Sequence, residues 1–320
     1  MTAGSKNLPR IAVTVGDPNG IGPEIAVRAA IALFAESGVR SLLVAEDFII
    51  DHTIDLLGVE HHARDAFDVH NAAALVPSDW HPGLVSAAAG SATVAYVRQA
   101  VGLVRSGHVH AIAAAPHSET AVNAAGIAFS GYSGLVADCT QTPRDHAFLM
   151  LEAKGLRVVH ATLHESVTQA VDRLTPALVQ AAAQAARDVL LRLGIAQPRL
   201  CVLGINPHAG ENGLFGNDDE RITKPAVLAM QALGWHVDGP VGADLALSEG
   251  LHDAYVAMLH DQGHIAVKML SPKGATALVA GIPLLFASVG HGAAFNLAGK
   301  GSADASAMTA TLKLLSRACS

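Results

Sequence analysis

The stretch IAVTVGDPNGIGPE, residues 11–24, decides the fold class, because it contains a strand, a tight turn and the start of a helix in that order. The apolar run at 11–15 predicts a buried strand, and Pro23 followed by Glu24 predicts the first turn of a helix. Thr175 and Pro176 open a second, Ala-rich helix that runs to about residue 193. Further apolar runs predict strands at 41–45, 111–115, 157–163, 200–205, 255–259 and 284–289. Alternating strands and helices indicate an α/β protein with doubly wound sheets.

The composition restricts the classes of function. Only 15% of the 320 residues are charged, against a typical share of about 25%, and the net charge is −7 with no basic cluster. These values argue against a nucleic-acid partner and against an anionic membrane surface. The widely spread Cys139, Cys201 and Cys319 form no disulfide framework, and no apolar leader precedes the first strand. We therefore expect a reducing, cytoplasmic location.

Residues 274–299 contain no Asp, Glu, Lys or Arg, and the segment is long enough to cross a bilayer. Gly281, Pro283, Gly290 and Asn296 interrupt it, which is typical of a buried strand with flanking turns. We therefore expect a soluble protein in which this segment contributes to a sheet and does not span a membrane.

Histidines follow several of the predicted strands. His164, His208, His260 and His291 each stand where an apolar run ends, and open α/β sheets bind ligands beyond the carboxyl ends of their strands. Three neutral imidazoles suit Zn, Ni, Co or Fe and leave coordination positions open for a substrate. The residues alone leave two interpretations open, a catalytic metal site or structural histidines, because long separations along the chain carry little local signal.

Two glycine-rich segments are candidates for binding an anion or a nucleotide. Residues 16–24 match neither GxGxxG nor the P-loop, so they predict either an anion site at a helix N-terminus or a tight structural turn. Residues 291–304 are rich in small residues that let backbone approach a flat ligand, and Asn296 and Asp304 are suited to bind ribose or adenine. A small-residue turn packed under a helix is the alternative for this segment. No serine or cysteine has the surroundings of a nucleophile.

Three motifs together resemble the 4-hydroxythreonine-4-phosphate dehydrogenase family of vitamin B6 synthesis. They are GDPxGIGPE at 16–24, NPHAGE at 206–211 and HDQG at 260–263, and segment 291–304 is similar to the adenosine-binding loop of isopropylmalate dehydrogenases. The resemblance implies a two-domain fold like that of isocitrate and isopropylmalate dehydrogenases, with doubly wound sheets and a cleft between the domains. One domain would comprise residues 1–128 and 284–320, and residues 129–283 would form the other, which carries the metal ligands and the dimer interface.

The resemblance also implies the ligands and their residues. One divalent metal per site, zinc, cobalt or a similar ion, would be held by His164, His208 and His260 in a homodimer whose active site is shared between the subunits. Lys268 and Asp244 keep the family residue type near the metal motif and are the candidates for proton transfer and its orientation. The NAD cofactor would bind through His291, Gly292, Asn296, Gly299 and Asp304.

The sequence departs from the family where the phosphate of the substrate would bind. The family's Gly-His-Thr-Glu turn is Gly-Tyr-Ser-Gly at 131–134, and its lysine and arginine fall on Glu119 and Phe286. A phosphate dianion needs cations, so we expect a flatter and more apolar substrate. Segments 128–132, 162–167 and 288–292 resemble a side branch that oxidises terephthalate cis-dihydrodiol, a cyclic dicarboxylate diol. The candidate substrate-binding residues are His117, Ser118, Ser130, Tyr132, Ser133 and Phe286.

The expected reaction is NAD-dependent oxidative decarboxylation of that diol to protocatechuate in aromatic degradation, with the metal polarising the ketone formed after hydride transfer. Two other functions stay open. The missing phosphate ligands argue against the vitamin B6 enzyme itself. Segment 291–304, the candidate nucleotide site, argues against a metal-dependent hydrolase or lyase without nucleotide.

Overall fold

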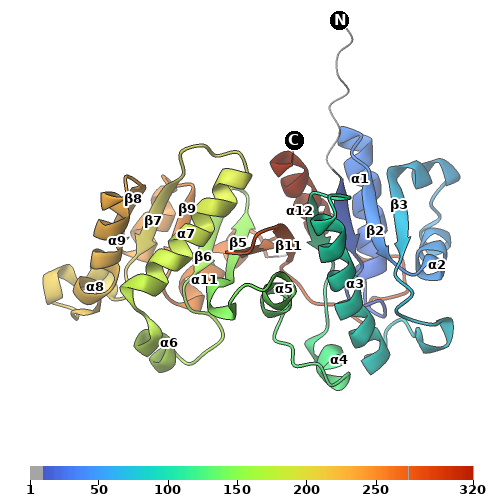
Figure 1. Ribbon diagram of the computed structural model, residues 1–320, viewed down its shortest axis with the longest axis horizontal. Coiled ribbons are helices and arrows are strands. Elements are labelled where there is room, and N and C mark those ends of the chain that lie inside the picture. Colours follow the sequence, from blue (N-terminus) through green and yellow to red (C-terminus); the bar gives the residue numbers. More distant parts are fainter. Residues whose placement is uncertain (1–9, 273, 320) are drawn as a thin grey trace, which may run out of the picture. The chain divides into compact units, whose positions relative to one another are not determined.

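The computed structural model describes residues 10–272 and 274–319, which form two α/β units (Figure 1). The first unit contains the chain up to Thr140 and from Leu284 onward, and the second contains Gln141–Pro283. Helix α5 (Tyr132–Thr140) belongs to the first unit, where it packs on α3 (Ala87–Arg105). The expected boundary at residue 128 precedes α5, whereas the division in the structure follows it.

The first unit is built on a parallel sheet whose strands lie in the order β3 (Phe67–Asn71), β2 (Ser41–Ala45), β1 (Ile11–Thr14), β4 (Ala111–Ala114) and β11 (Leu285–Val289). Ile11 pairs with Ser41 on one side and with Ala111 on the other. β1, β2 and β4 are buried along their whole length, as expected for a parallel sheet that helices cover on both faces.

Helices of the first unit follow the predicted pattern around this sheet. α1 (Gly22–Ser37) starts with Pro23 and Glu24 in its first turn and ends at Gly38, whose φ is 71°. α12 (Ser306–Ala318) packs on α1, β4 and β11, while α3 packs on β1, β2 and β4. The remaining helical segments are α2 (Asp47–Leu57), α4 (Glu119–Ala124), η1 (His61–Ala66) and η2 (Pro77–Asp79).

The second unit has a mixed sheet with the strand order β10 (Thr276–Ala280), β5 (Phe148–Ala153), β6 (Leu156–His160), β9 (Ala254–Ala257), β7 (Arg199–Leu203) and β8 (His236–Val241). β5 is antiparallel to both of its neighbours, and the other pairs are parallel. Its helical segments are α6 (Val167–Arg173), α7 (Pro176–Arg192), α8 (Asp218–Arg221), α9 (Thr223–Ala232), α10 (Ala243–Glu249), α11 (His260–Leu270), η3 (Arg144–His146) and η4 (Pro207–Gly213).

Two expectations about local structure can be compared with these elements. The helix predicted from Thr175 and Pro176 is confirmed as α7, and the Thr175 Oγ1 accepts the N–H of Leu178 at 3.1 Å. The strand predicted at 157–163 ends earlier, at His160, so His164 stands in the loop that follows β6. Within the described residues, no helix is long and apolar enough to cross a membrane, and the uncharged segment contributes β10 and β11.

Candidate functional site

The carboxyl edge of the second unit's sheet gathers the three predicted metal ligands. His164 follows β6, His208 lies in the turn after β7, and His260 begins α11 after β9; these strands are neighbours in the order β6, β9, β7. The ring centroids of His164 and His260 are 5.6 Å apart. His208 packs its ring against Phe215, with 5.8 Å between the centroids. The edge therefore brings two of the three rings close together.

A left-handed turn, η4, presents His208. Its residues 208–212 all have φ values between 44° and 81°, and only Gly210 among them is a glycine. The left-handed conformation costs a residue with a side chain about 1–2 kcal/mol, and such strain is concentrated at functional sites. The turn leaves His208 exposed to solvent. The NPHAGE motif thus encodes a strained turn, which the residue pattern alone did not reveal.

A buried carboxylate, Asp219, stabilises this turn from inside, and the sequence analysis missed it. The residue is 1% exposed. Its Oδ1 accepts the N–H of Ile205 at 2.8 Å and the hydroxyl of Thr223 at 2.7 Å, and its Oδ2 accepts the N–H of Asn206 at 2.9 Å. Because these hydrogen bonds are charge-assisted, they fix the backbone just before His208.

The donor chemistry of the three histidines fits a divalent metal, but one copy of the chain does not complete the site. Neutral imidazole nitrogens are good ligands for zinc and cobalt. Across residues 10–272 and 274–319, however, no group of three or more His, Cys, Asp or Glu side chains is arranged to hold an ion. Within the residues described, His164, His208 and His260 are therefore not arranged as a ready ligand set, and a metal site shared with a second copy stays a prediction.

Two further histidines, His160 and His264, lie beside His260. The rings of His264 and His260 stack with 3.7 Å between centroids and an interplanar angle of 11°. His160 is 2% exposed, and its Nε2 lies 3.1 Å from the Nδ1 of His264. Burial lowers the pKa of His160 to about 3 and that of His264 to about 4, so both rings are neutral at pH 7. The four-residue spacing from His260 to His264 is the helical signal that identifies His264 from sequence.

The two candidates for proton transfer lie on α11 and α10. Lys268 stands about two turns after His260 on α11, and burial lowers its pKa, which favours proton exchange. Asp244 is exposed in the first turn of α10. A Cβ at Gly242 would lie 2.9 Å from the Asp244 Oδ1 and 3.9 Å from the His208 Cα. Gly242 therefore leaves room for the carboxylate of Asp244, while the His208 turn lies at ordinary contact distance.

In the first unit, the glycine-rich turn packs against the predicted cofactor segment. The N–H of Ile21 donates to the carbonyl of Ala293 at 2.9 Å, and the N–H of Gly299 donates to the Glu24 Oε1 at 2.8 Å. A Cβ at Gly20 would lie only 2.8 Å from the Ala293 Cβ, so a glycine is needed there. The buried Glu24 carboxylate lies in the first turn of α1, where it would repel a bound anion. The turn at 16–24 therefore fits the structural interpretation better than an anion site.

The cofactor segment offers groups that fit a nucleotide. The Glu24 Oε2 is buried and has no hydrogen-bond partner within the described chain. The Asp304 Oδ1 accepts the N–H of Ser306 at 2.9 Å at the start of α12. Exposed glycine backbone allows a flat ring to approach closely, and the Glu24 Oε2 can accept a hydroxyl of a ligand that reaches it. Among the residues predicted to bind NAD, His291 is half-buried, and the exposed ones are Gly292, Asn296, Gly299 and Asp304.

Four rings gather at the start of α5 in the first unit. The centroid of His117 lies 4.9 Å from that of Phe129 and 4.4 Å from that of Tyr132, and Tyr132 lies 5.4 Å from Phe286. The Tyr132 hydroxyl donates to the carbonyl of Ala115 at 2.8 Å. Burial lowers the pKa of His117 to about 4, so its ring is uncharged at pH 7. These four rings, which we name the aromatic cluster, therefore pack edge to face and carry no charge at pH 7.

The predicted substrate-binding residues differ in exposure. Phe286 has no exposed surface and Tyr132 is 4% exposed, so both belong to the packed interior of the aromatic cluster. Phe286 can therefore shape a substrate site through Tyr132 but does not itself face one. Ser118 caps α4, with its Oγ accepting a backbone N–H at 3.2 Å. The candidates that keep exposed surface are His117, Ser130 and Ser133.

Comparison with known proteins identified relatives over nearly the whole chain. The chain is 44% identical over 306 residues to the 1,2-dihydroxy-3,5-cyclohexadiene-1,4-dicarboxylate dehydrogenase of Comamonas sp, covering 96% of each protein. It is 37% identical over 328 residues to the D-threonate 4-phosphate dehydrogenase of Cupriavidus necator, covering 97% of each. The crystal structure of a terephthalate 1,2-cis-dihydrodiol dehydrogenase from Burkholderia xenovorans matches with a TM-score of 0.74 and 42% identity, covering 97% of this chain and 98% of that one.

These relatives are dehydrogenases, and the Burkholderia structure shares the α/β fold. The chain is therefore an oxidoreductase of the dehydrogenase class, which implies a nicotinamide cofactor. A family model described as pyridoxal phosphate biosynthetic protein PdxA matches residues 29–315, and the chain belongs to this family. The resemblance stated from the three motifs and the predicted fold class are thereby confirmed.

Proposed function

We propose that this protein oxidises and decarboxylates terephthalate cis-dihydrodiol to protocatechuate and carbon dioxide, with NAD and one divalent metal per site. The aromatic cluster carries the proposal. Its uncharged His117 lies 4.9 Å from Phe129 and 4.4 Å from Tyr132, between ring centroids. Such rings favour apolar contact with a cyclic substrate, and they offer no counter-charge to a phosphate, which concentrates two negative charges on one group. The 44% identity to the Comamonas dicarboxylate dehydrogenase supports the same class of substrate.

When bound, NAD accepts a hydride and a zinc or cobalt ion polarises the substrate oxygens. His164, His208 and His260 would hold the ion. Burial lowers the pKa of Lys268 and so favours its neutral amine, which would accept the proton of the reacting hydroxyl and become an ammonium; Asp244 would orient that proton transfer. The exposed backbone of segment 291–304 would bind the adenosine part of the cofactor.

We further propose a homodimer whose metal site is completed by the second copy. One described chain brings together only His164 and His260, at 5.6 Å between centroids. Helix α11, which His260 begins, exposes three large apolar side chains, Ile265 at 55%, Met269 at 79% and Leu270 at 40%. An exposed apolar surface on the helix that begins with a proposed ligand fits burial against another copy of the same chain.

A steady-state comparison tests the proposed substrate. NADH formation is measured with terephthalate dihydrodiol, 4-phosphohydroxythreonine and D-threonate 4-phosphate on one preparation. We expect kcat/KM to favour the dihydrodiol by several powers of ten. A phosphate concentrates two charges on one group, whereas the two carboxylates of the dihydrodiol carry one charge each at opposite ends of the ring. Leaving the phosphate unpaired costs several kcal/mol, at about 1.4 kcal/mol per factor of ten. A chelator should abolish the reaction, and zinc or cobalt should restore it.

The other outcomes of this experiment identify the alternatives. Equal or higher kcat/KM for a phosphorylated substrate would contradict the proposal and favour the class of the Cupriavidus relative, to which the chain is 37% identical. Failure to bind NAD in a calorimetric titration would favour a metal-dependent hydrolase or lyase instead.

A further inference from the structure

We propose that His160 and His264 are positioning residues that fix the imidazole of His260. The inference rests on the proposed metal role of His260. The three rings form a chain from the end of β6 to the first two turns of α11: His160 contacts His264, and His264 stacks on His260. We name this chain of three rings the histidine relay.

The contact between His160 and the backbone of Leu149 fixes the hydrogen-bond directions within the relay. The carbonyl of Leu149 can only accept, so the His160 Nδ1, 3.2 Å away, carries the ring hydrogen. The Nε2 of the neutral His160 ring is then an acceptor, and the His264 Nδ1 donates to it at 3.1 Å. The same His264 Nδ1 lies 3.3 Å from the His260 carbonyl. The plane of the His264 ring is therefore set by two acceptors.

The oriented His264 ring restricts His260 from one side. The rings are 3.7 Å apart and within 11° of parallel, as expected for residues one helical turn apart. The Asp261 Oδ1 lies 2.7 Å from the His260 Nδ1 and accepts its hydrogen. The His260 Nε2 is then the nitrogen with a free lone pair. A metal-bound histidine usually has a carboxylate on one ring nitrogen and the metal ion on the other.

A glycine in α11 permits the relay to form. A Cβ at Gly263 would lie 2.3 Å from the His160 Nε2 and 2.7 Å from the Val158 Cγ1, closer than real Cβ contacts. Only a residue without a side chain lets α11 approach the end of β6 so closely. The HDQG motif therefore supplies both the proposed ligand, His260, and the glycine that admits its supporting ring.

The test measures metal affinity separately from catalysis. Co²⁺ is titrated into full-length protein in competition with a chromophoric chelator, and its visible absorption spectrum is recorded. We expect His160→Leu to weaken Co²⁺ binding about 10–100-fold, the usual effect of removing a residue that supports a metal ligand. His160→Gln, whose amide oxygen can replace the Nε2 acceptor, should recover most of the affinity and the wild-type spectrum.

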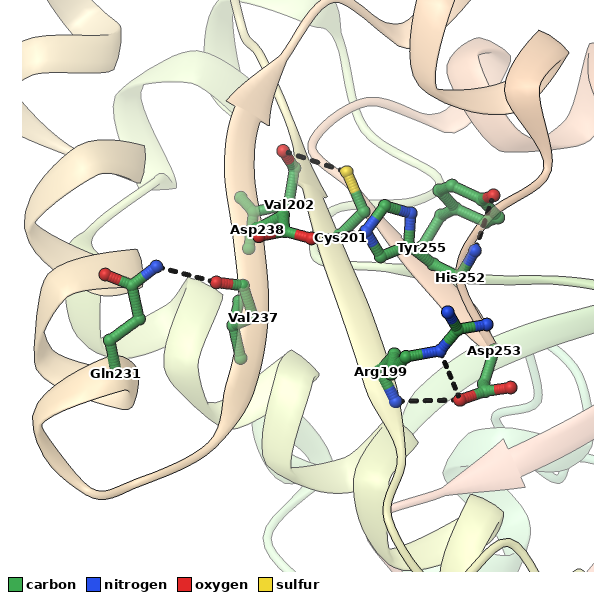
Figure 2. A network of polar contacts seen from close by, with 9 residues as sticks. All are labelled: Arg199, Cys201, Val202, Gln231, Val237, Asp238, His252, Asp253 and Tyr255. Atoms are coloured by element: carbon green, nitrogen blue, oxygen red, sulfur yellow. Dashed lines mark hydrogen bonds and ion pairs between the residues drawn. The ribbon is translucent and has the colours of Figure 1, made fainter.

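A matched control comes from the opposite end of the same sheet. His252 is also largely buried, with its side chain 13% exposed, and its Nε2 lies 2.7 Å from the Asp238 Oδ2. Figure 2 shows it beside Tyr255 and Arg199, near the amino ends of β7 and β9. His252→Gln disturbs a buried histidine of the second unit without touching the relay. It should leave Co²⁺ affinity unchanged even if the melting temperature falls.

The results separate the relay from the proposed function. If wild-type protein binds Co²⁺ and His160→Leu binds it equally well, the relay is refuted while the metal site stands. Equal losses in His160→Leu and His252→Gln would show general destabilisation and would also refute the relay. If wild-type protein binds no Co²⁺, the metal role of His260 fails, and the relay fails with it.

Discussion

Asp17, at the start of the turn after β1, is a buried carboxylate with one satisfied oxygen and one unsatisfied oxygen. Its Oδ1 accepts the N–H of Asn19 at 3.0 Å, while its Oδ2 has no hydrogen-bond partner in the described chain. Burial raises its pKa from 3.8 to about 6. The native state therefore binds a proton more tightly than the unfolded state, and stability falls as the pH rises from about 4 to above 6.

Asp17→Asn should therefore stabilise the protein at pH 8, where the wild type carries a charged buried carboxylate. A shift of about two pKa units corresponds to about 3 kcal/mol, an upper limit because the new amide also lacks a partner. The advantage should shrink as the pH falls to about 4. Urea unfolding at both values measures it, with the exposed Asp55→Asn as control. A difference that does not change with pH would contradict this explanation.

Single residues also show what the sequence could not indicate. His264 follows His260 by one helical turn, so periodicity alone places it beside a predicted ligand. His160 and Asp219 act through long-range contacts: His160 bonds to a helix 104 positions away, and Asp219 accepts N–H groups 13 and 14 positions back. Such pairings depend on how strands and helices pack, which no local pattern encodes.

At the scale of elements, the strands that were predicted are the apolar, buried ones, such as β1 and β7. Strands β3 and β8 were missed because they lie at sheet edges, carry polar residues and are only partly buried. β5 and β10 were missed as well, although both are largely buried. The antiparallel pairing of β5 makes the second sheet mixed, which a repeated strand-helix alternation does not reveal. The fold class was therefore predictable, and the edges and the direction of β5 were not.

The backbone strain of the left-handed turn η4 leads to a prediction about stability. Ala209 has a φ of 52°, so Ala209→Gly should relieve about 1–2 kcal/mol of strain in the folded state. The greater conformational freedom of glycine in the unfolded chain should offset about 0.4–1 kcal/mol of that gain. We expect a net gain of about 0.5–1 kcal/mol in the free energy of unfolding. Ala181→Gly, inside α7, is the matched control and should instead lose about 1 kcal/mol. Chemical denaturation measures both, and equal losses would argue against strain in the turn.

At the scale of the whole molecule, the proposed homodimer can be tested on α11. Met269 is 79% exposed, so Met269→Glu should leave the isolated fold intact but place a charge in the proposed interface. Sedimentation should show a shift from dimer to monomer, with loss of Co²⁺ binding. Leu233→Glu, at a 69% exposed position after α9, is the control and should stay dimeric. A fully active monomer would contradict a shared site.

The order of the strands in the two sheets also has a consequence for synthesis on the ribosome. All strands of the second unit lie in one continuous segment, Gln141–Pro283, whereas β4 of the first unit pairs with β1 and with the late strand β11. The first sheet is therefore completed only by residues made after the second unit, and the segment made in between can fold before it. Until β11 emerges, one edge of the nascent β4 lacks its partner, which is where a chaperone would find exposed strand.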